Sequence, residues 1–209
     1  MVDFVVVLDL SLMMQMRGFD VSARWAALWA AQSINWHPEH RLAAIVGYSE
    51  TARQLTLHEL ESVSVDMTVG SNLQDALAFS EQALAGGPGQ LLVFSEFVVT
   101  CHNLGRRQYF SFPPALETTE ATVGEILALP RSQIGVDAFR FGSGNPDSAG
   151  QAAILRAIGT IGGHVITVDY VGAVAATKVY IAGLLYGPSS PTRFPAEHRT
   201  EQRGRDAEP

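Results

Sequence analysis

Three short segments of the chain carry side-chain oxygen atoms that are suited to chemistry. Asp9 and Ser11 follow an apolar run at the start of the sequence. Ser71 comes just before a helix-like segment, and Ser95 and Glu96 follow a second apolar run. Carboxylate and hydroxyl oxygens can bind a hard cation, but they can equally accept backbone hydrogen bonds or cap a helix. Taken one at a time, these residues leave both interpretations open.

The elements that position these side chains follow from the alternation of short apolar runs with longer segments of helical periodicity. This alternation is typical of an α/β fold with three layers, in which helices cover both faces of a mainly parallel sheet. Strands are predicted at 2–10, 41–50, 90–96, 133–141 and 164–168, with a short antiparallel edge strand at 52–57. Helices are predicted at 21–34, from 72 to about 84, 118–129, 149–161 and 172–186, and a loop at 97–114. Since parallel strands present their carboxyl ends at one edge of the sheet, the three polar segments are expected to meet there.

The first predicted helix contains a stripe of aromatic residues. Trp25 and Trp29 are four residues apart, and Trp36 falls on the same face three turns after Trp25. A stripe with helical spacing normally forms the buried side of a helix. We therefore expect the tryptophans to pack on the sheet.

Composition limits the classes of partner and compartment. The 209 residues carry a net charge of −7, which argues against nucleic acid, because phosphate binding needs a concentrated basic surface. The single cysteine fits a reducing cytoplasm, and the apolar stretch at 171–187 is interrupted by Lys178, which argues against membrane insertion. We expect one domain at 1–186 and a disordered tail at 187–209, where Pro, Ser and balanced charges replace large apolar residues.

The polar segments resemble the metal-ion-dependent adhesion site of von Willebrand factor type A (VWA) domains. The family pattern is Asp-x-Ser-x-Ser after the first strand, a Thr before a helix, and Thr-Asp-Gly after a later strand. Here the counterparts read D-L-S-L-M from Asp9, G-S-N-L from Gly70 and S-E-F from Ser95. The stretches RQYFSFPP and GYSETARQL further resemble intracellular bacterial VWA proteins that accompany MoxR-type AAA+ ATPases, and chelatase-like subunits.

The resemblance implies a Rossmann-like VWA fold with a site for Mg²⁺ or Mn²⁺ at Asp9, Ser11, Ser71 and Glu96. Met13 stands where the family has a second serine ligand, and a thioether is too soft a donor for Mg²⁺. Glu96 replaces the family aspartate, and the residue after it is phenylalanine rather than glycine. We therefore expect a degenerate site that binds a divalent ion weakly or not at all.

The function implied by the family is protein recognition rather than catalysis. Expected partners are a MoxR-type AAA+ ATPase, other subunits of a complex, or a second copy of the chain. The aromatic residues Tyr109, Phe110 and Phe112 are candidates for partner binding if they are exposed, and the alternative is that they pack under the sheet edge.

Two other functions compete with this interpretation. The first is a VWA adhesion module that still depends on Mg²⁺. The second is a phosphatase of the haloacid dehalogenase type, which also begins with a strand ending in aspartate. That chemistry needs a second aspartate two residues later, where this chain has Ser11. A serine hydrolase is disfavoured because GYSET lacks the second glycine of a nucleophile elbow.

Overall fold

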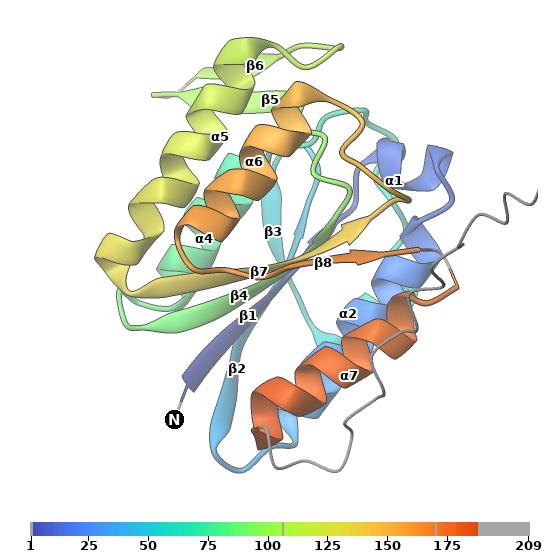
Figure 1. Ribbon diagram of the computed structural model, residues 1–209, viewed down its shortest axis with the longest axis vertical. Coiled ribbons are helices and arrows are strands. Elements are labelled where there is room, and N and C mark those ends of the chain that lie inside the picture. Colours follow the sequence, from blue (N-terminus) through green and yellow to red (C-terminus); the bar gives the residue numbers. More distant parts are fainter. Residues whose placement is uncertain (1, 106, 170, 188–209) are drawn as a thin grey trace, which may run out of the picture.

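The centre of the molecule is a six-stranded sheet with the strand order β3-β2-β1-β4-β7-β8 (Figure 1). The computed structural model describes residues 2–105, 107–169 and 171–187. The strands are β1 (Val2–Asp9), β2 (His40–Tyr48), β3 (Ala52–Leu55), β4 (Gly89–Ser95), β7 (Ile134–Phe141) and β8 (Val165–Val168). β3 pairs antiparallel with β2, and the other pairs of this sheet are parallel. The predicted fold class, including the short antiparallel edge strand, is confirmed.

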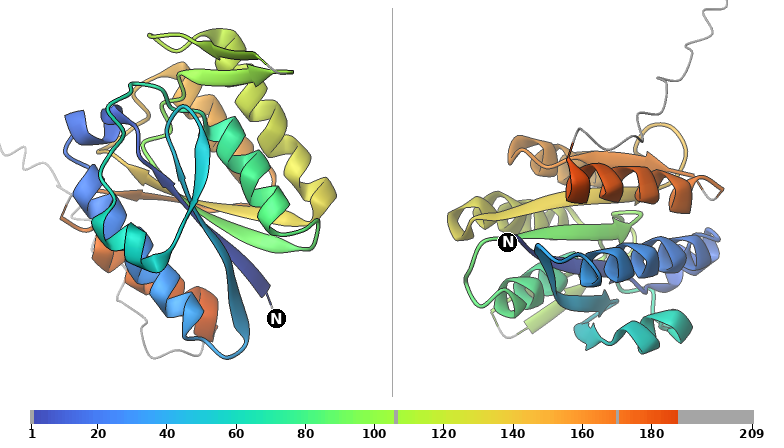
Figure 2. Two further views of the ribbon diagram at one scale, coloured as in Figure 1. Left: turned by 180° about the vertical axis from the view of Figure 1, so that it is seen from behind. Right: turned by 90° about the horizontal axis from the view of Figure 1, so that it is seen from below.

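Helices cover both faces of the sheet (Figures 1 and 2). One face carries α2 (Asp20–Asn35), α3 (Leu57–Ser62) and α7 (Ala173–Tyr186), and the other carries α4 (Leu73–Ala83), α5 (Leu116–Ala128) and α6 (Ala149–Thr160). The side chains of the central strand β1 alternate between the two layers. Phe4, Val6 and Leu8 pack in the core on the α2 side, and Val5 and Val7 pack in the core on the α4 side. Both faces of β1 are therefore buried, which explains why its sequence is an unbroken apolar run.

The prediction that the tryptophans pack on the sheet is wrong for two of the three. Trp36 is 77% exposed and Trp25 is also exposed, whereas Trp29 is partly buried, with the Lys178 ammonium 5.7 Å from its ring centroid. The sheet-facing side of α2 is formed instead by fully buried alanines, namely Ala23, Ala26, Ala27, Ala30 and Ala31. Small side chains let the helix approach the strands closely, and the bulky indoles of Trp25 and Trp36 are left on the outer side.

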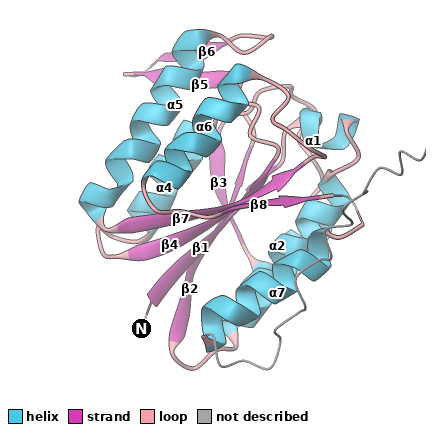
Figure 3. Cartoon of the chain, viewed as in Figure 1, coloured by secondary structure: helices cyan, strands magenta, loops and turns pink. Residues whose placement is uncertain are grey.

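The predicted loop at 97–114 contains regular structure. β5 (Cys101–Leu104) and β6 (Arg107–Phe110) form a separate two-stranded antiparallel hairpin (Figure 3). The short helix α1 (Leu12–Met16), the helix α3 and a 3-10 turn at Leu129–Ser132 were also not predicted. Each of these elements has at most six residues, which is too short to display a clear hydrophobic period.

Two predictions concern the carboxyl-terminal part of the chain. The tail predicted to be disordered lies, apart from Gly187, outside the described residues. Within the described residues, no helix has both the length and the hydropathy that crossing a membrane requires.

Candidate functional site

The carboxylate of Asp9 is the centre of a buried hydrogen-bond cluster at the carboxyl end of β1. Its Oδ1 accepts a hydrogen bond from the backbone N–H of Ser11 at 2.9 Å. Its Oδ2 accepts hydroxyl hydrogen bonds from Ser95 at 2.7 Å, Tyr48 at 3.3 Å and Ser71 at 3.4 Å. The structure thus brings the three polar segments of the sequence together and adds Tyr48, which the sequence interpretation missed.

Strand pairing explains why these groups converge. β1 lies between β2 and β4, Asp9 is in register with Tyr48 at the end of β2, and Ser95 is the last residue of β4. The loop of Ser71 is held by a contact outside the sheet, because the Ser71 N–H donates to the hydroxyl of Thr100 at 2.9 Å. The position of Tyr48 at the end of a strand next to β1 was the signal that could have identified it.

Burial controls the ionisation of this cluster. The pKa of Asp9 is raised above its usual value because the carboxyl group is desolvated, and hydrogen bonds from Ser95 and Ser11 oppose that effect. Burial and the charge of Asp9 raise the pKa of Tyr48 well above its ordinary value. Tyr48 therefore remains a protonated donor at neutral pH, and the cluster consists of one acceptor group surrounded by donors.

Glu96 is a second buried acid beside this cluster. Its side chain is 1% exposed, and its Oε2 lies 3.1 Å from Nε of Arg17. Arg17 also pairs with Asp147 at the surface. Burial and the charge of Asp9 raise the pKa of Glu96 to about 7, and the attraction of Arg17 offsets this only in part. Neither Arg17 nor Asp147 was predicted, and the two are 130 positions apart in the sequence.

The donor atoms of the site do not fit an octahedral Mg²⁺ ion. Met13 is buried and offers sulfur where an oxygen is needed. The hydroxyl of Ser11 is buried and makes no hydrogen bond with the described residues, so its oxygen is free to bind an ion. Oδ2 of Asp9, in contrast, already accepts hydrogen bonds from three hydroxyl groups and is not free. The fixed positive charge of Arg17 beside Glu96 would repel a divalent cation. In the part of the chain that the structure describes, no group of three or more His, Cys, Asp and Glu side chains is arranged to hold a metal ion.

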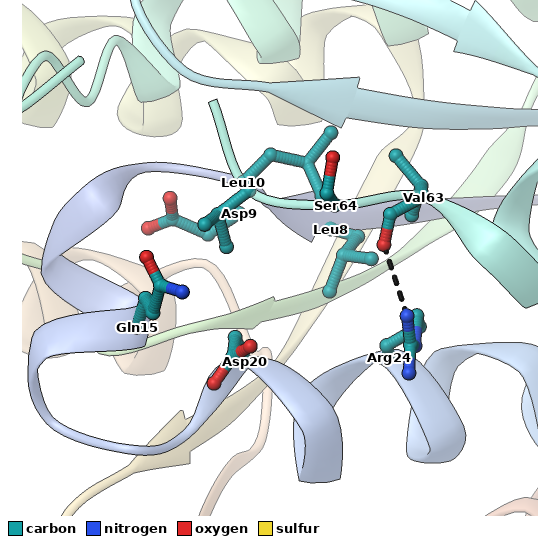
Figure 4. Close-up of a pocket in the computed structure, with 9 residues that line it drawn as sticks. Leu8, Asp9, Leu10, Gln15, Asp20, Arg24, Val63 and Ser64 are labelled. Atoms are coloured by element: carbon teal, nitrogen blue, oxygen red, sulfur yellow. Dashed lines mark hydrogen bonds between the residues drawn. The ribbon is translucent and has the colours of Figure 1, made fainter. Parts of the chain in front are cut away.

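A small cavity of about 140 Å³ lies beside Asp9, between the end of β1, the α1–α2 segment and residues 63–65. Figure 4 shows Asp9, Gln15 and Asp20 around this cavity, with Arg24 donating to the carbonyl of Val63 at 3.1 Å. Ligand pockets for organic molecules usually measure roughly 300–1,000 Å³. This cavity has room for a few water molecules and is too small for most organic substrates.

The aromatic residues of the predicted partner-binding stretch lie in the open. Tyr109 and Phe110 are on β6 and Phe112 follows it, with exposed fractions of 42%, 51% and 58%. The hairpin adjoins the Asp9 cluster, because the backbone carbonyl of Ser71 accepts the N–H groups of Thr100 and Cys101 at 3.0 and 3.1 Å. An exposed aromatic surface and the buried polar cluster are therefore neighbours on the same edge of the molecule.

Phe97 occupies the position where the family pattern has glycine. Its φ angle is +61°, its ring is buried in the core, and its N–H donates to Oγ of Ser95 at 2.8 Å. A residue with a Cβ atom is strained by about 1–2 kcal/mol in this left-handed conformation. The backbone thus keeps the geometry of a glycine turn, although the side chain is large.

Replacement of Phe97 tests this strain. Both Phe97→Ala and Phe97→Gly are expected to destabilise the protein by about 2–5 kcal/mol, because both lose the buried ring. The Gly variant is expected to be the more stable of the two by about 1 kcal/mol, since only glycine relieves the strain. Urea unfolding measures the difference, and an Ala variant as stable as the Gly variant would show that the turn is unstrained.

A mainly parallel sheet of this order, with an Asp-x-Ser loop, a hydroxyl-bearing loop before a helix and a second acidic loop gathered at its carboxyl edge, is the arrangement of a VWA domain. The chain belongs to the family described as "Rv0959-like protein, vWA domain", whose model matches residues 3–174. A comparison with curated proteins finds no match.

Solved structures share the fold at low sequence identity. The vWF domain of the type V pili tip protein Mfa5 from Porphyromonas gingivalis is 11% identical, with a TM-score of 0.67 over 89% of this chain and 95% of that chain. The SpRpn10 VWA domain is 11% identical, with a TM-score of 0.57 over 84% of this chain and 93% of that chain. The PilB minor pilin from Streptococcus sanguinis is 13% identical, with a TM-score of 0.55 over 89% and 61% of the two chains. At these identities the likeness concerns the fold alone.

Proposed function

We propose that the protein is a cytoplasmic, non-enzymatic adaptor that binds a protein partner at the carboxyl edge of its sheet, with a degenerate adhesion site that works without a divalent ion. The observation that carries the proposal is the exposed aromatic surface of Tyr109, Phe110 and Phe112 beside the buried Asp9 cluster. VWA domains generally mediate contacts between proteins, and an exposed group of large apolar side chains is typical of an interaction surface.

The hairpin presents its aromatic side chains from a fixed base. Asn103 of β5 donates from its backbone N–H to Oε1 of Gln74 at 2.8 Å and from Nδ2 to Oδ1 of Asp75 at 3.2 Å. The ring of Tyr109 stacks on His102, with a centroid distance of 5.3 Å and an interplanar angle of 13°. A surface that is already ordered loses less entropy when it binds, which favours recognition.

The burial of the polar cluster favours a structural role over catalysis. The hydroxyl groups of Ser95 and Ser71 belong to fully buried residues, and Tyr48 and Asp9 are each only 1% exposed. A general base or nucleophile must come within hydrogen-bond distance of its substrate. These groups instead hold the three loops together beneath the surface that we assign to the partner.

The partner class that we propose is an AAA+ ATPase of the MoxR type, or other subunits of a complex that contains one. This follows from the resemblance of the sequence to VWA proteins that accompany such ATPases. A second copy of the chain is the competing partner, and static light scattering at two protein concentrations separates self-association from binding to another protein.

The test is the combined replacement of Tyr109, Phe110 and Phe112 by serine. We expect the immobilised variant to retain at least about tenfold less partner protein from a lysate of the native host, because buried aromatic side chains dominate interface energies. Quantitative mass spectrometry measures retention, and circular dichroism verifies the fold. The control is Trp36→Ser, which removes an aromatic residue that is 77% exposed at the C-cap of α2. Equal loss in both variants, or loss only in the control, would place the partner surface elsewhere.

A further inference from the structure

The guanidinium group of Arg17 joins two acidic residues across the site. Its Nε lies 3.1 Å from Oε2 of the buried Glu96, and it also pairs with Asp147 on the loop between β7 and α6. The Arg17 side chain is 37% exposed, so it spans from solvent to the buried acid. Among the described residues, Arg17 is the only basic side chain within ion-pair distance of Glu96.

The position of Arg17 in the sequence relates it to the residue that replaces the family ligand. Arg17 follows Met13 by four residues, and its backbone N–H donates to the Met13 carbonyl at 3.2 Å. Residues with this spacing share one face of a helix, and helical side chains lean toward the amino terminus. Arg17 is the C-cap residue of α1, and its side chain reaches the buried carboxyl group of Glu96.

Hydrogen bonds fix the loop that carries Asp147, the acidic partner of Arg17 at the surface. Arg140 is buried and donates to the carbonyl groups of Gly144 at 2.8 Å and Asn145 at 3.0 Å. Gln151 accepts the Asp147 N–H at Oε1 at 2.7 Å and donates from Nε2 to the Glu96 carbonyl. The loop that carries Asp147 is thus tied to the segment that carries Glu96. Figure 1 shows α1 beside this loop at the carboxyl edge of the sheet.

Charge balance gives Arg17 its significance. Asp9, Glu96 and Asp147 place three carboxyl groups in one region, and the charges of Asp9 and Asp147 both disfavour ionisation of Glu96, whereas the charge of Arg17 favours it. A cluster of like charges needs a cation, which can be a bound metal ion or a basic side chain. Here the cation belongs to the chain itself.

We propose that Arg17 is a built-in cation that replaces a divalent metal ion at this site, and that removal of its charge lets the carboxyl groups of Asp9 and Glu96, with the buried hydroxyl of Ser11, bind a hard divalent cation. The inference deepens the proposed function, since it explains how the carboxyl edge works without an ion.

The experiment is calorimetric titration of MnCl₂ into chelator-treated protein. We expect no Mn²⁺ binding tighter than about millimolar in the wild type and at least tenfold tighter binding in Arg17→Gln. Met13→Ser, which restores the hydroxyl but keeps the guanidinium, is expected to behave like the wild type. Arg41→Gln is the matched control, because it removes an arginine that pairs with Asp3 at the amino end of β1, away from the site.

Further measurements make the outcome decisive. In Arg17→Gln/Glu96→Gln the gain should disappear, and Mn²⁺ should raise the melting temperature of Arg17→Gln but not of Arg41→Gln. Wild-type binding of Mn²⁺ clearly tighter than millimolar would overturn the proposal, and this result does not depend on the stability of the variant. A flat titration of folded Arg17→Gln, or a gain in Met13→Ser alone, would also overturn it. Partner retention by the hairpin variant is a separate measurement, so either proposal can fail without the other.

Discussion

Replacement of Asp9 by alanine is expected to lower the free energy of unfolding by about 3 kcal/mol. The change leaves the hydroxyls of Ser95, Tyr48 and Ser71 and the N–H of Ser11 without their common acceptor. Each buried donor left unsatisfied costs about 1–3 kcal/mol, and the lost desolvation penalty of the carboxyl group offsets part of the sum. Urea unfolding at pH 7, followed by circular dichroism, measures the change.

Two further variants bracket this result. Asp9→Asn keeps one acceptor oxygen and should lose only about half as much stability, because its amide nitrogen is a donor facing hydroxyl donors. Asp3→Ala removes a carboxylate of the same strand that pairs with the exposed Arg41, and such a solvent-screened surface pair contributes little to stability. An Asp9→Ala variant that is no less stable than Asp3→Ala would show that the cluster contributes little to the fold.

The stability of the wild type is expected to fall as the pH rises from about 5 to 8 because of Glu96. Its pKa is raised from 4.5 to about 7 by burial, so the folded protein holds this proton more tightly than the unfolded chain. For an acid with a raised pKa, the stabilisation is complete below the unfolded pKa and is lost as the pH rises through the folded one. A shift of this size corresponds to an upper limit of about 3 kcal/mol.

The variant Glu96→Gln isolates this contribution from that of other acids. It cannot ionise, so the difference in unfolding free energy between Glu96→Gln and the wild type should grow between pH 5 and pH 8. The charged groups that face Glu96 are Arg17, Asp9 and Asp147, and the pKa of Asp9 is raised in the same direction. Urea midpoints at four pH values test the prediction, and parallel pH profiles for the two proteins would contradict it.

Both results would measure how the buried acids at this edge of the sheet affect the stability of the fold. The Asp9 cluster is expected to stabilise the fold through hydrogen bonds, whereas the ionised form of Glu96 is tolerated only because Arg17 lies beside it. The carboxyl edge of the sheet is thus stabilised by side chains of the protein, without a bound ion. It gives the exposed hairpin of Tyr109 and Phe110 a stable base for binding a partner.

The sequence by itself determined the fold class and the meeting of three polar segments. The apolar run of β1 and the alternation of strands with helices required a buried parallel sheet. In such a sheet the residues after Leu8 and after Phe94 must lie at one edge, because parallel strands point the same way. The meeting of these segments around Asp9 was predictable for this reason, whereas the left-handed conformation of Phe97 was not predicted.

Only the tertiary structure decided which side chains complete the site and which lie on the surface. Arg17 and Asp147 meet through the conformation of two loops, which no local period encodes. The outward position of Trp25 and Trp36 depends on how closely the alanine face of α2 packs on the strands. Periodicity shows which face of a helix or strand is apolar. The distance between two packed elements, however, depends on the side-chain volumes of both elements. An ion pair such as Arg17–Asp147 depends on two chain segments that are far apart in the sequence.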